Sequence, residues 1–259
     1  GPAPAPPPFC ASFCSARAST CPPDGIEIAS KRLGLVDADY GESGWTITTE
    51  EGYQPMAISK DQYAKGISVD EFINDMQVNK EKFVENIDAF TVTDEDRAFF
   101  DANPVSIAAF GEDWCTDVIQ FLPVVAKLAR ELSSVDVRVF KRDENLDLMQ
   151  PYLKEGKYQS IPVFVVHDAD WNELGHFIER PATVTAQMAT ETHRFAKENP
   201  HLEGVNRTYE HMSEETRQAV RANSSNFRWS NMDAWNRIFI DEFKALITSG
   251  ATADAAADD

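Results

Sequence analysis

Residues 109–118, Ala-Phe-Gly-Glu-Asp-Trp-Cys-Thr-Asp-Val (AFGEDWCTDV), join two segments of different character. Residues 104–110 (PVSIAAF) have the short apolar composition of a strand, and residues 115–132 (CTDVIQFLPVVAKLAREL) have the apolar spacing of an amphipathic helix. Cys115 therefore falls at a strand-to-helix turn, near the N-terminus of the helix. The partial positive charge of the helix and its free N–H groups favour a thiolate there, which is the reactive form of cysteine.

Acidic side chains near Cys115 act against that effect. Glu112, Asp113 and Asp117 place negative charge close to the same helix start, and like charge raises the pKa of a thiol. Asp117 also competes for the unpaired N–H groups of the first turn. We therefore expect the Cys115 thiol to be less acidic than the thiol of a typical redox site.

Outward from this stretch, the chain alternates strands and helices. Further strands are predicted at residues 135–140 (VDVRVF), 161–168 (IPVFVVHD) and 171–179 (WNELGHFIE), and helices at 145–156 and from Pro181 to about Glu198. Two strands joined by a crossover helix should be parallel, and the final strand pair should be antiparallel. The pattern predicts an α/β fold with a mixed β-sheet flanked by helices.

Helices are also predicted before and after this sheet. Ser68 is placed to cap one or two helices within residues 69–90, and Thr93 precedes an acid-rich helix start. Residues 213–222 and 231–247 have the pattern of two further helices, the last packed on the core or on a partner. We expect four regions: a disordered Pro/Ala/Cys tail (1–25), a small irregular segment with two short strands within residues 44–58 (26–67), the α/β domain (68–199), and a C-terminal helical extension with an acidic tail (200–259).

The composition of the chain argues against two classes of partner, nucleic acids and membranes. The 259 residues include 43 acidic and 24 basic ones, a formal net charge of −19, which argues against attraction to nucleic acid phosphates or anionic membrane surfaces. The chain has no run of about 18 apolar residues and no secretory signal pattern at its start. We expect a soluble, cytoplasmic protein with neither nucleic acid nor membrane as a partner.

No cofactor or metal is expected. Cys10, Cys14 and Cys21 lie in the Pro-rich tail at spacings that match no zinc or iron–sulfur pattern, and the histidines show no ligand spacing. The tail cysteines are interpreted as part of an unstructured segment, with a role for one of them in resolving a disulfide as the alternative.

Linked motifs give the sequence a family resemblance. The run EDWCTD at residues 112–117, Pro123, the segment RDENLDLMQPYLKEGKYQSIPVF at 142–164 and ELGHFIERP at 173–181 resemble the thioredoxin superfamily, in particular a branch of thioredoxin-like proteins with an E-D-W-C-x-D signature. The similarity covers about residues 69–188. It implies a thioredoxin-like fold over roughly half of the chain.

The resemblance also implies roles by position. Trp114 and Cys115 match the thioredoxin tryptophan and nucleophilic cysteine, and Pro123 matches the proline of the active-site helix. Ile161 and Pro162 match the cis-proline loop, which faces the thiol and offers backbone groups to an extended substrate.

Three departures from the thioredoxin pattern limit the chemistry. Val118 replaces the resolving cysteine, Thr116 and Asp117 replace Gly-Pro, and Ala109 replaces the buried aspartate that assists proton transfer in many thioredoxins. The usual dithiol cycle is thereby excluded. A mixed disulfide at Cys115 can form, but its release needs an external thiol or a tail cysteine.

Two functions from different classes follow. The first is thiol–disulfide exchange through Cys115 on a protein or small-molecule thiol or disulfide, by an oxidoreductase that lacks the resolving cysteine. The second is a non-catalytic binding or chaperone-like protein, in which Cys115 is a small, buried and inert core residue. A peroxidatic cysteine is a more distant reading, because the Pro and Thr residues that a peroxiredoxin places ahead of its cysteine are absent.

Two polar segments have a functional and a structural interpretation. Residues 142–145 (RDEN) either form a polar network near the site or cap a helix. Glu179, Arg180 and Pro181 either bind a ligand or form a salt-bridged corner between a strand and a helix.

Overall fold

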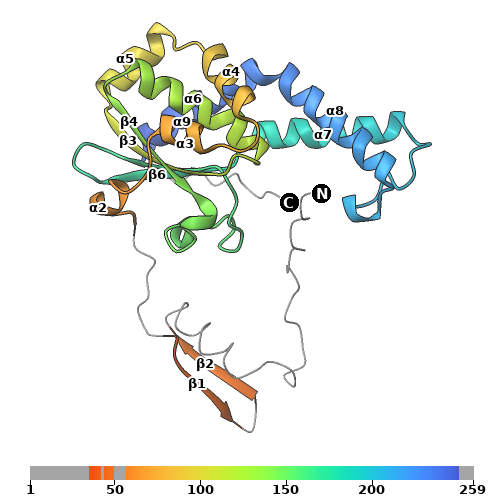
Figure 1. Ribbon diagram of the computed structural model, residues 1–259, viewed down its shortest axis with the longest axis horizontal. Helices are drawn as coiled ribbons and strands as arrows, with labels where there is room; N and C mark the ends of the chain where they lie inside the picture. The colour runs from red at the N-terminus through yellow and green to blue at the C-terminus, as the bar shows by residue number, and fades with distance from the viewer. Residues whose placement is uncertain (1–34, 42–43, 50–56, 251–259) are drawn as a thin grey trace, which may run out of the picture. The chain divides into compact units, whose positions relative to one another are not determined.

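The computed structural model describes residues 35–41, 44–49 and 57–250 (Figure 1). The chain divides into one unit that ends at Pro55 and a second that begins at Met56. Cys10, Cys14 and Cys21, the tail expected over residues 1–25 and the acidic end after Gly250 lie outside the described residues. Nothing in the structure therefore bears on the roles expected for these segments.

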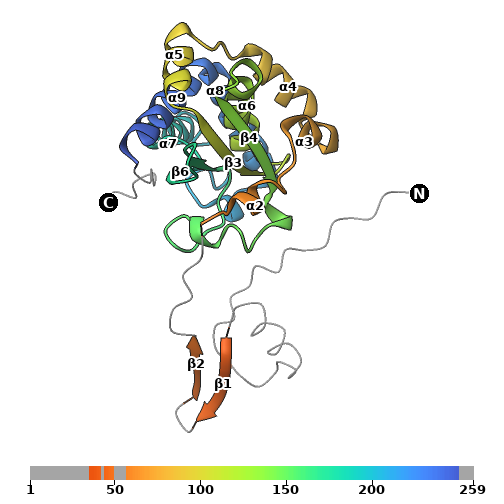
Figure 2. The ribbon, with the colours of Figure 1, turned by 90° about the vertical axis from the view of Figure 1, so that its left-hand side faces the viewer.

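The described part of the first unit is a pair of antiparallel strands, seen in Figure 2. Strand β1 (Leu35–Gly41) pairs with β2 (Gly44–Thr49), with Tyr40 opposite Trp45. We expected two strands within residues 44–58; β2 lies in that range, but its partner precedes it. Asp37 and Asp39 are of a type depleted in strands, which is why the composition did not mark residues 35–41.

A four-stranded sheet forms the centre of the second unit. It has the order β4-β3-β5-β6, built from β3 (Val105–Gly111), β4 (Val135–Lys141), β5 (Val163–His167) and β6 (Glu173–Ile178). Strand β3 is parallel to β4 and antiparallel to β5, and β5 is antiparallel to β6. The predicted α/β fold with a mixed sheet is confirmed.

Helices precede, connect and follow the strands. Before the sheet come α2 (Lys60–Tyr63), α3 (Val69–Asp75), α4 (Lys80–Ala89) and α5 (Asp94–Ala102), and α6 (Thr116–Glu131) connects β3 to β4. The predicted caps are confirmed, because Ser68 and Thr93 each accept a hydrogen bond from the backbone N–H three residues on. Among the helices that the structure describes, none is long and apolar enough to cross a membrane.

The helix predicted over residues 145–156 is wrong. Two short 3-10 turns, η1 (Arg142–Glu144) and η2 (Gln150–Tyr152), and the turn between them take its place. Hydrogen bonds here span three residues, such as Tyr152 N–H to the Met149 carbonyl at 2.9 Å. Pro151 explains the difference, because proline has no N–H and its ring clashes with the preceding helical turn.

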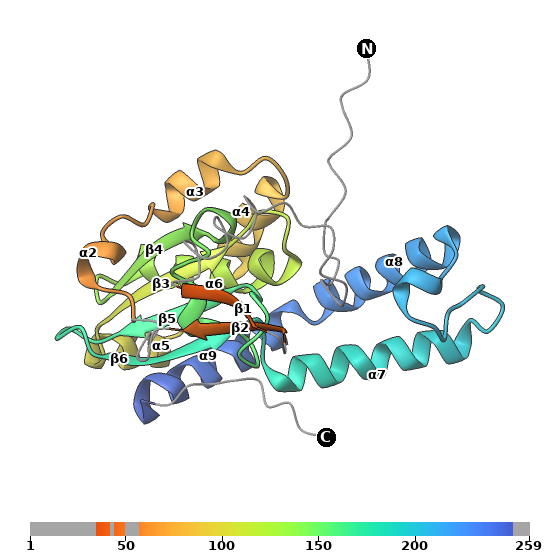
Figure 3. The same ribbon diagram turned by 90° about the horizontal axis from the view of Figure 1, so that it is seen from below.

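Three helices follow β6. They are α7 (Ala182–Glu198), α8 (Glu214–Ser230) and α9 (Met232–Ser249), with a 3-10 turn η3 (Tyr209–His211) before α8. Helices α7 and α8 run side by side beyond the sheet in Figure 3. Helix α9 returns to the sheet, where the Phe239 ring meets Phe121, Phe164 and Phe177 at 5.0, 5.5 and 5.1 Å. The last helix thus packs on the core.

Asp96 ties α5 to α9. Its carboxylate is fully buried, accepts a hydrogen bond from Arg237 at 2.7 Å and forms a salt bridge with Lys244 at 2.6 Å. Burial alone would raise the pKa of Asp96, but the two cations outweigh it and lower the pKa to about 2. Ionised Asp96 therefore stabilises the contact between the two helices.

We predict that Asp96→Asn lowers the free energy of unfolding by about 3 kcal/mol, because it leaves two cations without their shared buried partner. Urea unfolding at pH 7 measures this loss. Glu95→Gln is the matched control: Glu95 is 89% exposed and 3.8 Å from Lys244, so its loss should stay below about 0.5 kcal/mol. Equal losses in the two variants would contradict the assignment.

Urea unfolding of Asp96→Asn and of the parent chain at several pH values tests the pH dependence. The pKa of Asp96 is lower in the folded chain than in the unfolded one, so its contribution is present above the unfolded value and is lost as pH falls from about 4 to about 2. The loss of stability across this window should be smaller in Asp96→Asn than in the parent chain.

Candidate functional site

Four segments meet at one edge of the sheet because of its strand register. Gly111 at the end of β3 lies beside Lys141 at the end of the parallel strand β4. Phe110 lies opposite Val163, the first residue of the antiparallel strand β5, and Val163 lies opposite Ile178, the last residue of β6. The turns after β3, β4 and β6 and the loop before β5 are therefore brought together.

Cys115 is the N-cap residue of α6 and lies at this edge. Its carbonyl accepts the first hydrogen bond of the helix, from the Ile119 N–H at 3.0 Å. Val118, in the position of the missing cysteine, is fully buried against Gly111. A Cβ atom at Gly111 would lie 2.9 Å from a Val118 methyl carbon, so the turn requires glycine there while Val118 is present.

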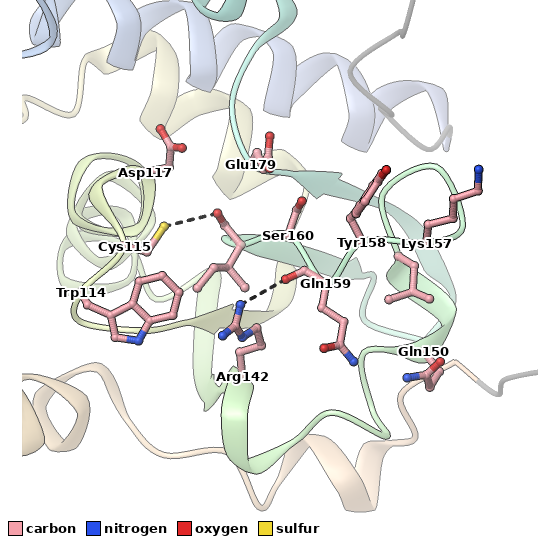
Figure 4. A pocket seen from close by; sticks show the side chains of 12 residues that line it. Trp114, Cys115, Asp117, Arg142, Gln150, Lys157, Tyr158, Gln159, Ser160 and Glu179 are labelled. Carbon is pink, nitrogen blue, oxygen red and sulfur yellow. Dashed lines mark hydrogen bonds between the residues drawn. The ribbon is translucent and has the colours of Figure 1, made fainter. Parts of the chain in front are cut away.

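The thiol faces the loop before β5. The Cys115 Sγ donates to the Ile161 carbonyl at 3.5 Å, as the dashed line in Figure 4 shows. The Ile161–Pro162 peptide bond is cis. The structure therefore brings Cys115 and Ile161, two of the predicted site residues, into direct contact.

Burial is the main influence on the Cys115 thiol. It raises the pKa of Cys115, and the Asp117 carboxylate raises it further. The backbone N–H groups of Val118 and Asp117 and the Arg228 guanidinium lower the pKa, but the net direction is upward. The expected weakly acidic thiol agrees with this direction, although desolvation contributes more than the neighbouring acid.

Cys115 opens onto a cavity of about 600 Å³ (Figure 4). The Trp114 side chain is half-exposed at its mouth, with the Arg142 guanidinium 5.0 Å from the ring centre. Tyr158 is also exposed. The cavity is lined by Trp114, Cys115, Asp117, Arg142, Gln150, Leu153, Lys157, Tyr158, Gln159, Ser160, Ile161 and Glu179. Aromatic, cationic and amide groups thus surround the thiol.

The segment 142–145 divides between the two interpretations given to it. Arg142 lines the cavity, donates to the Gln159 carbonyl at 3.4 Å and pairs with Asp143 at 2.6 Å. Asn145 instead donates to the Lys141 carbonyl at 2.8 Å within the turn. The arginine belongs to the polar surroundings of the cavity, and the asparagine stabilises the turn.

Glu112 and Asp113 face a second cavity, of about 290 Å³, away from the thiol. Glu112 accepts from the Asp143 N–H at 2.8 Å, and burial raises the pKa of Glu112. Asp113 accepts from the N–H groups of Gln77 and Val78 at 2.6 and 3.1 Å. These two carboxylates fasten the turn before Cys115 to η1 and to the loop between α3 and α4.

Asp117 is buried and held by cations from distant parts of the chain. Arg180 lies 2.6 Å from its Oδ2, and Arg228 lies 2.8 Å from its Oδ1. Arg228 also donates to Gln120. The sequence analysis missed Arg228 and Gln120. Nothing in the local pattern of α8 indicates that Arg228 is buried, and its partner Asp117 lies 111 residues away in the sequence.

The corner after β6 is salt-bridged. Glu179 pairs with Lys154 at 2.8 Å. Burial alone would raise the pKa of Glu179, but the hydrogen bonds and the nearby cations, Lys154 first, lower it overall. Arg180 pairs with Asp117. Because Glu179 also lines the cavity, the structural and functional interpretations of this corner both apply. In the described ranges, no group of three or more His, Cys, Asp and Glu residues is placed to hold a metal ion.

A family model described as Thioredoxin matches residues 66–194. This range contains the whole sheet, α6 and the loop with the cis peptide bond. The chain belongs to the thioredoxin-like superfamily. The predicted superfamily is thereby confirmed, and the narrower branch with the E-D-W-C-x-D signature stays a prediction.

The thioredoxin-like chain is similar to a protein of unknown function from Pseudomonas aeruginosa, at 14% identity and a TM-score of 0.45, over 68% of this chain and 99% of that one. It is also similar to an HIV epitope-scaffold, at 17% identity and a TM-score of 0.44, over 50% of this chain and 81% of that one. No curated protein matches the sequence.

We predict that Val118→Cys allows a disulfide to Cys115 on mild oxidation. Residues three apart on the first helical turn are neighbours, and cysteine is small enough for the space that Val118 fills against Gly111. Peptide mapping by mass spectrometry detects the link between positions 115 and 118.

Val118→Ala, oxidised in the same way, is the control and should leave Cys115 open to alkylation. If Val118→Cys folds and Cys115 is found only as a free thiol or joined to other cysteines, the geometry inferred for this turn is wrong.

Proposed function

We propose that the protein carries out thiol–disulfide exchange through Cys115, with an external thiol completing the reaction. The observation that carries this proposal is the position of the Cys115 sulfur, at the N-terminus of α6, open to a cavity and 3.5 Å from the Ile161 carbonyl. The helix N-terminus supports attack by the sulfur as a thiolate. The cavity supplies room for a substrate against the loop before β5.

The reaction has two exchange steps. The Cys115 thiolate attacks a disulfide R–S–S–R′, forms Cys115–S–S–R and releases R′–S⁻, which takes up a proton. An external thiol R″–SH, as its thiolate, then attacks the substrate sulfur, forms R–S–S–R″ and returns Cys115 as a thiolate. No net oxidant is consumed, because one disulfide is exchanged for another.

The external thiol is needed because Val118 stands where a resolving cysteine would. Among the residues that the structure describes, Cys115 is the one cysteine, so none of them supplies a second thiol. Low-molecular-weight thiols are abundant in reducing compartments, and we therefore place the reaction in the cytoplasm.

The cavity lining bears on the substrate. Exposed Trp114 and Tyr158 rings and the backbone around Ile161 suit an extended peptide segment or a small thiol compound. The net charge of −19 disfavours nucleic acid and anionic membranes as partners in this proposal. We propose no cofactor.

We predict that oxidised glutathione forms an adduct at Cys115, and that its rate rises with pH. Burial raises the pKa of Cys115, so the thiolate fraction, and with it the rate, should rise about tenfold per unit between pH 7 and 8.5. Peptide-resolved mass spectrometry measures the adduct at Cys115 separately from adducts on the tail cysteines.

Removal of the adduct by added reduced glutathione tests the second step. Cys115→Ser is the control and should show adducts on tail peptides alone. A parent chain that behaves like Cys115→Ser at pH 8.5 would exclude the proposed exchange.

A second candidate function is binding of extended chains without turnover. It is favoured by the upward pKa of Cys115 and by donation from Sγ to the Ile161 carbonyl, since both stabilise the neutral thiol. In this function the thiol is a packing group that supports the loop before β5.

Binding of a reduced, carboxymethylated and therefore unfolded protein separates the two functions. If binding is the function, Cys115→Ser should keep the affinity of the parent chain, because a hydroxyl can also donate to the Ile161 carbonyl. Tyr158→Ala should weaken binding, since it removes an exposed ring from the cavity. Absence of binding by the parent chain would rule out this second function.

A further inference from the structure

One side chain of α8, that of Arg228, contacts the N-terminal part of α6. The Arg228 side chain is 5% exposed. Its Nη1 donates to Asp117 Oδ1 at 2.8 Å and to Gln120 Oε1 at 2.5 Å, and its Nη2 lies 3.6 Å from the Met188 sulfur. A residue that follows the family-matched range thus reaches a carboxylate two residues after Cys115.

Both oxygens of the Asp117 carboxylate are occupied by cations. Arg228 binds Oδ1, and Arg180, from the turn before α7, binds Oδ2 at 2.6 Å. In Figure 4 the Asp117 carboxylate points away from the Cys115 sulfur, which faces the Ile161 carbonyl instead. The two arginines pull the acid toward α7 and α8.

The charge balance of this arrangement is unusual for a helix start. Cations are unfavourable near a helix N-terminus, and burial of a guanidinium is costly unless it is paired. Two arginines and one aspartate leave one net positive charge beside Cys115. Such a charge stabilises a nearby thiolate.

Two other charged groups that line the cavity are paired with residues outside its lining. Arg142 pairs with Asp143, and Glu179 pairs with Lys154. Lys157 also lines the cavity. Asp113 and Asp117 each lie two residues from Cys115 along the chain. Asp113 faces the second cavity, so the orientation of Asp117 matters most for the sulfur.

We propose that Arg228 is a positioning residue for Cys115, which together with Arg180 holds the Asp117 carboxylate turned away from the sulfur. The inference deepens the proposed function and rests on it for its purpose. Its physical content, control of one carboxylate by a cation from α8, is measurable without any disulfide substrate.

The test is the pH profile of Cys115 alkylation by iodoacetamide in the full-length chain, read by peptide-resolved mass spectrometry. Arg228→Gln should raise the midpoint by about half a unit to one unit and slow alkylation at pH 7.5 about three- to tenfold. Arg228→Lys should raise the midpoint less than Arg228→Gln does, because lysine returns the charge with a shorter reach.

Arg221→Gln is the matched control. Arg221 lies on the same helix and stacks on Tyr209 at 5.2 Å, away from Asp117, so its profile should match that of the parent chain. A shift in Arg228→Gln but not in Arg221→Gln supports the proposal, and equal profiles in all three chains overturn it.

Asp117→Asn tests whether Arg228 acts through the carboxylate. In the Asp117→Asn background, Arg228→Gln should shift the midpoint by less than half of its effect in the parent chain. An equal shift in both backgrounds would show that Arg228 acts on the sulfur directly, and the proposed positioning role would be wrong.

Folding is checked by circular dichroism for every variant. If Arg228→Gln does not fold, Arg180→Gln applies the same test from the more exposed side of the carboxylate, and an unchanged profile there overturns the proposal. If the parent chain shows no exchange with glutathione but the alkylation shifts are observed, the proposed function is refuted and the role of Arg228 stands.

Discussion

The pairing of β3 with both of its neighbours is the constraint on which the site depends. Because β4 is parallel to β3, the end of β4 is carried to the end of β3, and Arg142 follows it directly. Because β5 is antiparallel to β3, it must start where β3 ends, so Ile161 and Pro162 arrive beside Cys115. The hairpin of β5 and β6 then returns Glu179 and Arg180 to the same edge. A slip of register in β5 would move the Ile161 carbonyl away from the sulfur.

This dependence explains which features could be predicted from sequence. Strands β3 and β5 are short, apolar and buried on both faces, so composition locates them, and the Ser68 and Thr93 caps mark helix starts. The family resemblance implied that the loop of Pro162 faces Cys115. The segment 145–156 was predicted as a helix, but Pro151 within it prevents a continuous one.

Other parts of the site depend on contacts that a local pattern does not encode. Arg228 resembles the other arginines of α8, and its burial follows only from how α8 packs beside α7. Glu112 and Asp113 are adjacent to Trp114 in sequence, yet their side chains turn to a different cavity because backbone N–H groups of other segments bind them. Proximity in sequence therefore overstated the negative charge that acts on Cys115.

Opposing effects set the balance between the thiol and the thiolate of Cys115. Burial and Asp117 favour the neutral thiol, whereas the helix N–H groups and Arg228 favour the thiolate. A thiolate with a high pKa is scarce but strongly nucleophilic, so a raised pKa slows attack without abolishing it. Val118 acts on a different step: it fills the space against Gly111 and leaves the adduct at Cys115 without an internal partner on the helix. The first attack and the release of the adduct are thus controlled by separate residues, and loss of one half-reaction does not imply loss of the other.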